Sequence, residues 1–154
     1  MNETMAKHAS RDIVVDEVFA HSAETIWKAL TDGSLIARWL MPAEGFEAVP
    51  GKDFTFRTKP AGAWDGTIRC RVIDVKPARR LSYSWRGGDE GNIGYGSRLD
   101  TVVTWILSPL GEGRRVQLVH SGFLTPKNDT AFQNMSKGWR TILPRLNAIV
   151  DQRD

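Results

Sequence analysis

The architecture of this chain is set by its C-terminal stretch FQNMSKGWRTILPRLNAI, Phe132 to Ile149. Its apolar residues recur at steps of three and four, at Phe132, Met135, Trp139, Ile142, Leu146 and Ile149. This spacing places them on one face of an amphipathic helix. Pro126 or Asp129 marks the start of the helix, and Pro144 is expected to kink it, because proline cannot donate to the carbonyl four residues back. The chain therefore ends in a long helix with one apolar side.

The segment between residues 46 and 123 has the period-two pattern of β-strands. Glycine and proline separate runs in which apolar and polar residues alternate, as in KDFTFRTK (52–59) and RRLSYSWR (79–86). This turn spacing predicts an antiparallel meander. The sides of the strands that are predicted to face inward carry the aromatic residues Phe54, Phe56, Tyr83, Trp85 and Trp105.

Before the meander, the pattern changes from strand to helix. Residues 11–20 alternate like a strand, and two short helices are expected at 22–30 and at about 31–40, the first capped by Ser22. Residues 1–10 are expected to form a disordered tail, and residues 11–154 a single domain. A curved sheet with one apolar face needs a cover, and only the C-terminal helix is long enough to provide it. The predicted fold is α+β, with a curved antiparallel sheet of about seven strands wrapped round that helix.

Composition excludes several classes of protein. The net charge of +3 comes from dispersed pairs such as Arg79-Arg80 rather than from a basic block, so no nucleic-acid partner is expected. No apolar run approaches the ~20 residues of a membrane span, and no membrane insertion is expected. The single cysteine, Cys70, indicates a reducing, cytoplasmic location and is expected to be inert packing. The three histidines lack metal-ligand spacing, so neither a metal nor another cofactor is expected.

The stretch VQLVHSGF, Val116 to Phe123, carries the candidate for polar chemistry. Alternation along a strand turns His120 to the apolar side and Ser121 to the other, which excludes a Ser–His nucleophilic pair. His120 is then either a core histidine, hydrogen-bonded to Tyr83 or a backbone carbonyl, or a group that acts on a ligand. No inward carboxylate is expected to orient its ring, although Glu17 on the first strand is not assigned to a face.

The inward aromatic residues allow two interpretations. They can fill the core, or they can line a gap between the curved sheet and the helix, as in many small-molecule sites. The candidate ligand-binding residues are Phe54, Phe56, Tyr83, Trp85, Trp105, His120, Met135 and Trp139. No catalytic or metal-ligating residue is assigned. On the outer face of the sheet, Val102 and Ile106 would allow a homodimer.

Four blocks of the sequence resemble the bacterial homologues of the activator of the heat-shock-protein-90 ATPase, in the START-like, birch-pollen-allergen-like (SRPBCC) superfamily. The blocks are VFAHSAETIWKALTDGSLIARWL (18–40), WDGTIRCRVIDVKPARRLSYSW (64–85), TVVTWILSPLGEGRRVQLVHSGF (101–123) and GWRTILPRL (138–146). The resemblance extends from about Ile13 to Val150. It implies a helix-grip fold with a deep hydrophobic cavity between the sheet and the C-terminal helix. Pro144 and the glycine-rich GGDEGNIGYG (87–96) depart from the family pattern and are expected to alter the cavity mouth.

The resemblance implies three alternative functions. Binding or carrying of an apolar small molecule, such as a lipid, an aromatic or a polyketide-like compound, is favoured by the inward aromatic residues. A cyclase- or hydrolase-type enzyme that uses His120 with Tyr83 is less favoured, because no inward carboxylate is expected. A chaperone ATPase-regulating module follows only from the family name, and the short chain makes a chaperone partner doubtful.

Overall fold

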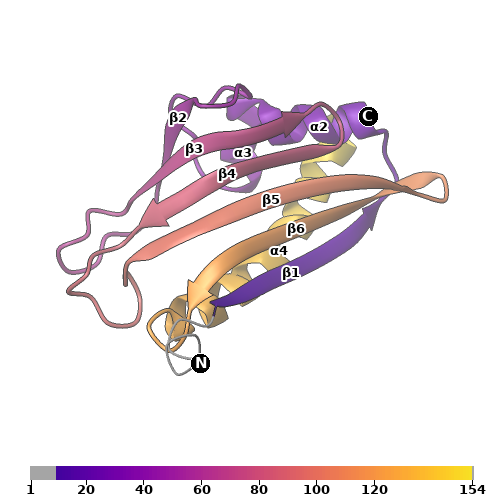
Figure 1. Ribbon diagram of the computed structural model, residues 1–154. Helices are drawn as coiled ribbons and strands as arrows, with labels where there is room; N and C mark the ends of the chain where they lie inside the picture. The colour runs from indigo at the N-terminus through magenta and orange to yellow at the C-terminus, as the bar shows by residue number, and fades with distance from the viewer. Residues whose placement is uncertain (1–9, 154) are drawn as a thin grey trace.

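The structure is a computed structural model in which residues 10–153 are described. The elements follow the predicted order of one strand, two short helices, a meander and a long C-terminal helix (Figure 1). They are β1 (Ser10–Phe19), α2 (Ala23–Thr31), α3 (Gly33–Trp39), β2 (Asp53–Arg57), β3 (Thr67–Lys76), β4 (Arg80–Gly87), β5 (Leu99–Leu110), β6 (Gly113–Leu124) and α4 (Asp129–Arg153).

The strands form one antiparallel sheet in the order β1-β6-β5-β4-β3-β2, and α4 lies across one face of it (Figure 1). This arrangement confirms the α+β helix-grip fold. The expected number of about seven strands was wrong, because the described residues form six. Between α3 and β2 the chain forms an isolated bridge of Glu44 with Thr55 and hydrogen bonds of Gly51 and Lys52 with Val72 of β3, and Gly45 and Gly51 have φ of 81° and 90°.

Of the disordered tail expected at residues 1–10, only Ser10 is among the described residues. Residues 1–9 lie outside the described residues, and Ser10 is the first residue of β1, where it pairs with Leu124. The sheet thus begins one residue earlier than the sequence pattern predicted.

Each of the two short helices begins after a residue whose side chain accepts a hydrogen bond from a backbone N–H of the first turn. The Ser22 hydroxyl accepts from the Thr25 N–H at 3.2 Å, which caps α2. The Asp32 carboxylate accepts from the Ser34 N–H at 2.9 Å, which starts α3. The Trp39 indole then donates to the Ala29 carbonyl at 3.0 Å and joins the two helices. The sequence predicted both helices and the Ser22 cap correctly.

Helix α4 packs on the sheet along a line slightly different from the predicted stripe. Its buried positions are Ala131, Trp139, Leu143, Leu146, Ile149 and Val150, and three of these, Trp139, Leu146 and Ile149, belong to the predicted stripe. Met135 and Ile142 are only half-buried. Pro144 is exposed within the helix, and the expected kink stays a prediction. Among the described residues, no helix is long and apolar enough to cross a membrane.

Strand β6 contains a β-bulge that the alternation pattern did not predict. Asp12 pairs with Ser121 and Arg11 with Phe123, so Gly122 is the extra residue, and its φ is 100°. The bulge turns both His120 and Phe123 into the core, where their ring centroids lie 4.6 Å apart.

Candidate ligand-binding site

The eight predicted site residues divide into two groups. Five lie in the packed core, where none is more than 3% exposed: Phe54, Phe56, Tyr83, Trp105 and His120. The Phe54 ring packs edge to face against Phe56 and Tyr83, with centroids 5.4 Å and 5.2 Å apart. The other three, Trp85, Met135 and Trp139, line a pocket between α4 and the sheet. Five of the eight residues therefore pack in the core without lining the pocket, and three line it, of which Trp85 and Trp139 are also buried.

The pocket has a volume of about 230 Å³. On the α4 side its wall consists of Ala131, Asn134, Met135, Gly138, Trp139 and Ile142. On the sheet side it consists of Ile68, Trp85, Gly87 and Leu99. Leu40 and Met41, directly after α3, close one end. The remaining wall comes from two loops, through Thr58, Trp64, Gly88, Tyr95, Gly96 and Ser97.

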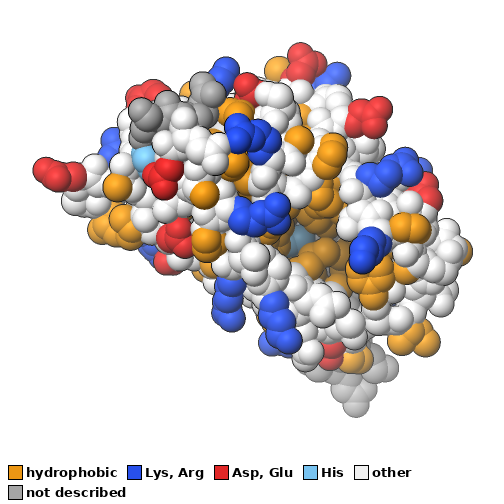
Figure 2. Space-filling model, turned by 180° about the vertical axis from the view of Figure 1, so that it is seen from behind, with side chains coloured by type: hydrophobic (Ala, Val, Ile, Leu, Met, Phe, Trp, Pro, Cys, Tyr) orange, Lys and Arg blue, Asp and Glu red, His pale blue; other side chains and the backbone are white. Residues whose placement is uncertain are grey.

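None of the described residues that line the pocket carries a charge. Seen from the α4 side, the molecule is hollowed, and hydrophobic side chains gather in the hollow (Figure 2). The polar lining residues are Thr58, Ser97 and Asn134. A concave site with apolar walls and a few polar groups is the usual form of a small-molecule site.

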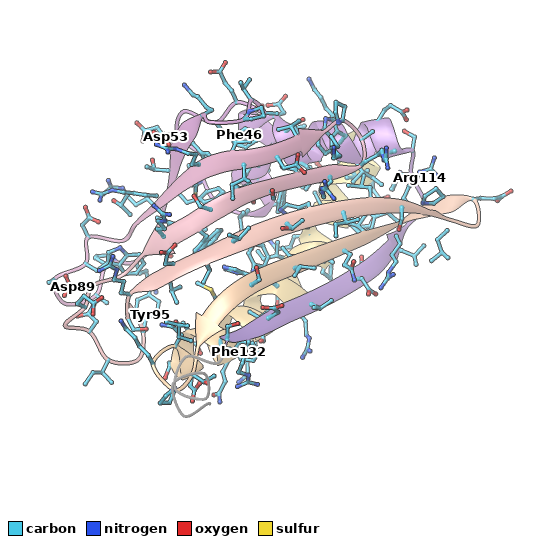
Figure 3. All side chains as sticks on the ribbon, in the orientation of Figure 1. Phe46, Asp53, Asp89, Tyr95, Arg114 and Phe132 are labelled. Atoms are coloured by element: carbon cyan, nitrogen blue, oxygen red, sulfur yellow. The ribbon has the colours of Figure 1, made fainter. Side chains whose placement is uncertain are left out.

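The two loops of the wall are held together by hydrogen bonds. The Asn92 side-chain amide donates to the Ala61 carbonyl at 2.7 Å, and the Tyr95 hydroxyl donates to the Lys59 carbonyl at 2.7 Å. Tyr95 and Phe132 lie at the same end of the molecule, opposite to Arg114 (Figure 3). The glycine-rich stretch 87–96, which was expected to alter the cavity mouth, contributes Gly87, Gly88, Tyr95 and Gly96 to the pocket wall.

The same loop is tied to the start of α4. Glu90 pairs with Lys127 at 3.2 Å and with Arg98 at 3.1 Å, and hydrogen bonds from Lys127 hold the pKa of the Glu90 carboxyl below its usual value. The Asn128 amide donates to the Arg98 carbonyl at 2.9 Å. The sheet, the loops and α4 therefore form a connected frame around the pocket.

Gly138 leaves an open space in the α4 wall. A Cβ atom built on it would meet nothing within 4 Å. A glycine inside a helix costs about 1 kcal/mol relative to alanine, and no neighbouring atom requires it here. Gly138 is exposed and lines the pocket, so a larger side chain could be introduced here without a clash with the described residues.

His120 does not line the pocket, but a chain of hydrogen bonds through its ring connects two residues that do. The Trp139 indole donates to His120 Nδ1 at 3.0 Å, because an indole nitrogen can only donate. Thr101 Oγ1 donates to the Trp85 carbonyl at 2.9 Å and so accepts from His120 Nε2 at 2.7 Å. Both ring nitrogens are used, and the ring is the neutral Nε2–H tautomer. The chain links Trp139 to Trp85, and both of these residues line the pocket.

Because His120 is buried, the pKa of its ring does not suit a catalytic base. Desolvation lowers the pKa of His120 from 6.5 to about 3. A sequence-based alternative paired it with Tyr83, but the Tyr83 hydroxyl accepts instead from the Trp105 indole at 3.1 Å, and burial raises the pKa of Tyr83. The core-histidine interpretation thus matches the structure in burial but not in partners, which are Thr101 and Trp139.

The other polar candidates lie away from the pocket. Ser121 points to the opposite side from His120, where its hydroxyl donates to the Val102 carbonyl at 3.4 Å. Glu17 is half-buried and accepts from the Asn147 amide at 3.4 Å. Burial raises the pKa of the Cys70 thiol, which fits inert packing. Within residues 10–153, no group of three potential ligands could hold a metal ion.

Most residues of the pocket wall were not predicted as site residues from the sequence, among them Trp64, Tyr95, Ser97 and Gly138. The first three lie in loops, which carry no periodicity that would assign them to a face. Two features of the sequence pointed to this wall: a glycine inside an amphipathic helix and a glycine-rich stretch, 87–96, that contains Tyr95. Only the second was connected with a cavity.

Comparisons with solved structures place this fold among known proteins. Protein MLL2253 from Mesorhizobium loti has a TM-score of 0.79 at 30% identity, over 94% of this chain and 99% of that chain. The Aha1 dimer from Colwellia psychrerythraea, solved in solution, has a TM-score of 0.69 at 18% identity, over 91% of this chain and 96% of that one. DynU16, a protein of the dynemicin biosynthetic locus, has a TM-score of 0.69 at 20% identity, over 91% of this chain and 47% of that chain.

The family comparison agrees with the structural one. No curated protein matches the chain at the level of sequence. The family model described as activator of Hsp90 ATPase homolog 1-like protein matches residues 20–151, which extend from the end of β1 almost to the end of α4. The chain therefore belongs to the family of activator of Hsp90 ATPase homolog 1-like proteins.

Proposed function

We propose that this protein binds or carries an apolar small molecule in the pocket between α4 and the sheet. The observation that carries this proposal is the pocket of about 230 Å³ between α4 and the sheet, whose described lining residues carry no charge. Apolar surface left uncovered in this way is buried favourably by an apolar ligand, at roughly 25 cal/mol per Å².

The volume of the pocket limits the size of the ligand. At about 230 Å³ it exceeds the ~150 Å³ engineered cavity that binds benzene and is smaller than the ~300 Å³ at which drug-sized sites begin. A compound of about two fused rings, or an aliphatic chain of similar volume, is the expected size class.

The walls are preorganised for such a ligand. The hydrogen-bond chain through His120 holds the Trp139 indole and ends at the backbone carbonyl of Trp85. A site that is already ordered loses little side-chain entropy on binding. The origin of DynU16 in a biosynthetic locus is compatible with this ligand class, since such loci make small molecules.

The neutral His120, with both nitrogens hydrogen-bonded, does not support the enzyme alternative that used it with Tyr83. A general base must present a free nitrogen to its substrate. Binding without a reaction is thus the function that the geometry supports best.

The test compares two substitutions at Gly138. Gly138→Leu extends a side chain into the open space, whereas Gly138→Ala adds one methyl group and serves as the matched control. Binding of 2-methylnaphthalene is measured by calorimetry in all three proteins. We expect one saturable site in the wild type, nearly unchanged binding in the alanine variant and at least tenfold weaker binding in the leucine variant.

Folding of each variant is checked by thermal unfolding. The alanine variant is expected to be more stable by about 0.5–1 kcal/mol, because it relieves the entropy cost of glycine in a helix. Equal affinity of the wild type and the leucine variant would place the bound probe outside this pocket and contradict the proposal.

A further inference from the structure

One polar atom in the pocket wall has no partner. Ser97 is 4% exposed, and its side-chain oxygen forms no hydrogen bond with any described residue. The other buried side-chain oxygens without a partner in the described part of the chain belong to Asp129 and Asn147, which do not line the pocket. A buried hydroxyl without a partner is costly, and most such groups in folded proteins find one.

The backbone around Ser97 is well satisfied, so the free hydroxyl does not reflect a loose loop. The Ser97 N–H donates to the Gly94 carbonyl at 3.1 Å, and the Asp89 N–H donates to the Gly96 carbonyl at 2.9 Å. Gly88 packs so closely that a Cβ there would lie 2.1 Å from the Ser97 carbonyl oxygen. The loop therefore holds Ser97 firmly in the wall.

The other two polar side chains that line the pocket are more exposed to solvent than Ser97. Asn134 is exposed and Thr58 is half-buried, so water can reach both. Ser97 alone combines deep burial with an unused hydrogen-bonding group among the described lining residues.

We infer that Ser97 is the polar anchor of the ligand site, and that the ligand is an apolar molecule carrying one hydroxyl or carbonyl group that hydrogen-bonds to the Ser97 hydroxyl once rotation of this small side chain turns its covered oxygen toward the pocket. This inference rests on the proposed function and adds the chemical class and orientation of the ligand. A hydroxyl can donate to a carbonyl or accept from a hydroxyl, so Ser97 serves either group. The apolar part of the ligand then lies against Trp85, Met135 and Trp139.

The test uses two probes of nearly the same shape, 2-naphthol and 2-methylnaphthalene, with the wild type and Ser97→Ala. We expect the wild type to bind 2-naphthol more tightly than 2-methylnaphthalene, and Ser97→Ala to lose roughly three- to tenfold in affinity for 2-naphthol, the range for one buried neutral hydrogen bond. The affinity of the variant for 2-methylnaphthalene should be unchanged. Its thermal unfolding should occur at the same temperature or higher, because the substitution removes a hydroxyl that pairs with nothing in the protein.

The outcomes separate the two proposals. Equal loss of both probes in Ser97→Ala, or a preference for 2-naphthol that survives the substitution, would overturn the role of Ser97 and leave the pocket as the binding site. A lower unfolding temperature of Ser97→Ala would also overturn it, because the hydroxyl would then have a structural partner. Binding of neither probe to the wild type would overturn the proposed function and, with it, the inference.

Discussion

Mild acid is predicted to destabilise this protein through His120. The folded state holds the ring neutral, with its pKa lowered from 6.5 to about 3 by burial, whereas the unfolded chain exposes it to water. Between these two values the unfolded state binds a proton that the folded state does not bind. The free energy of unfolding therefore falls as the pH falls below about 6.5.

The size of this effect follows from the two pKa values. Each pH unit within that window is worth about 1.4 kcal/mol, and pH 5 lies 1.5 units below the unfolded value. The expected loss between pH 7 and pH 5 is about 2 kcal/mol, a large part of the stability of an ordinary domain. The part of the free energy of unfolding that depends on the neutral His120 ring is fully present above about pH 6.5 and is lost as the pH falls toward 3.

The assay is urea unfolding followed by tryptophan fluorescence, at pH 7 and pH 5, for the wild type and His120→Gln. The glutamine amide can accept from the Trp139 indole and donate to Thr101, but it does not titrate. The pair of His21 with Asp151 is present in both proteins, so its contribution cancels. We expect the wild type to lose about 2 kcal/mol more than the variant between the two pH values. An equal loss in both proteins, or a His120 resonance that titrates near pH 6.5 in the folded protein, would refute this reasoning.

Three further predictions test other parts of the structure. The Cys70 thiol should not react with a disulfide reagent in the folded protein and should react fully in urea, because it is buried and its pKa is raised; rapid labelling of the native state would contradict this. Gly88→Ala should lower stability by about 2 kcal/mol or more, since φ is 85° and the new Cβ would meet the Ser97 carbonyl; a variant as stable as the wild type would exclude this clash. Glu90→Gln should speed amide hydrogen exchange in residues 88–98 and leave β5 unchanged, because the pair with Lys127 ties this loop to α4; equal exchange in both proteins would show that the pair does not hold the loop.

Periodicity was enough to assign most faces of the sheet and helices. In β4 the alternation of Leu81, Tyr83 and Trp85 with polar neighbours predicted which residues are buried, because only one face of the sheet is covered by α4. Ser82 is the exception, being 7% exposed although it alternates with the core residues. Alternation therefore predicts which residues are buried, but it does not predict which residues they pack against.

The position of the pocket depended on contacts that periodicity does not encode. Asn92 and Ala61 are 31 residues apart, and their hydrogen bond brings together the loops that form one wall. The partners of His120 likewise come from β5 and α4, and the bulge at Gly122 alters the alternation just after it. The sequence therefore predicted a site among the aromatic residues between the sheet and α4; five of its eight residues pack in the core and three line the pocket, and their role in binding stays a prediction.

The six tryptophans offer the most direct test of the pocket as the binding site. Three of them line it, Trp64, Trp85 and Trp139, and three do not, Trp27, Trp39 and Trp105. In an NMR titration with 2-methylnaphthalene, we predict intermolecular nuclear Overhauser effects from the probe to the indole protons of the first three. Contacts from the probe to Trp27, Trp39 or Trp105, with none to the pocket tryptophans, would contradict the account.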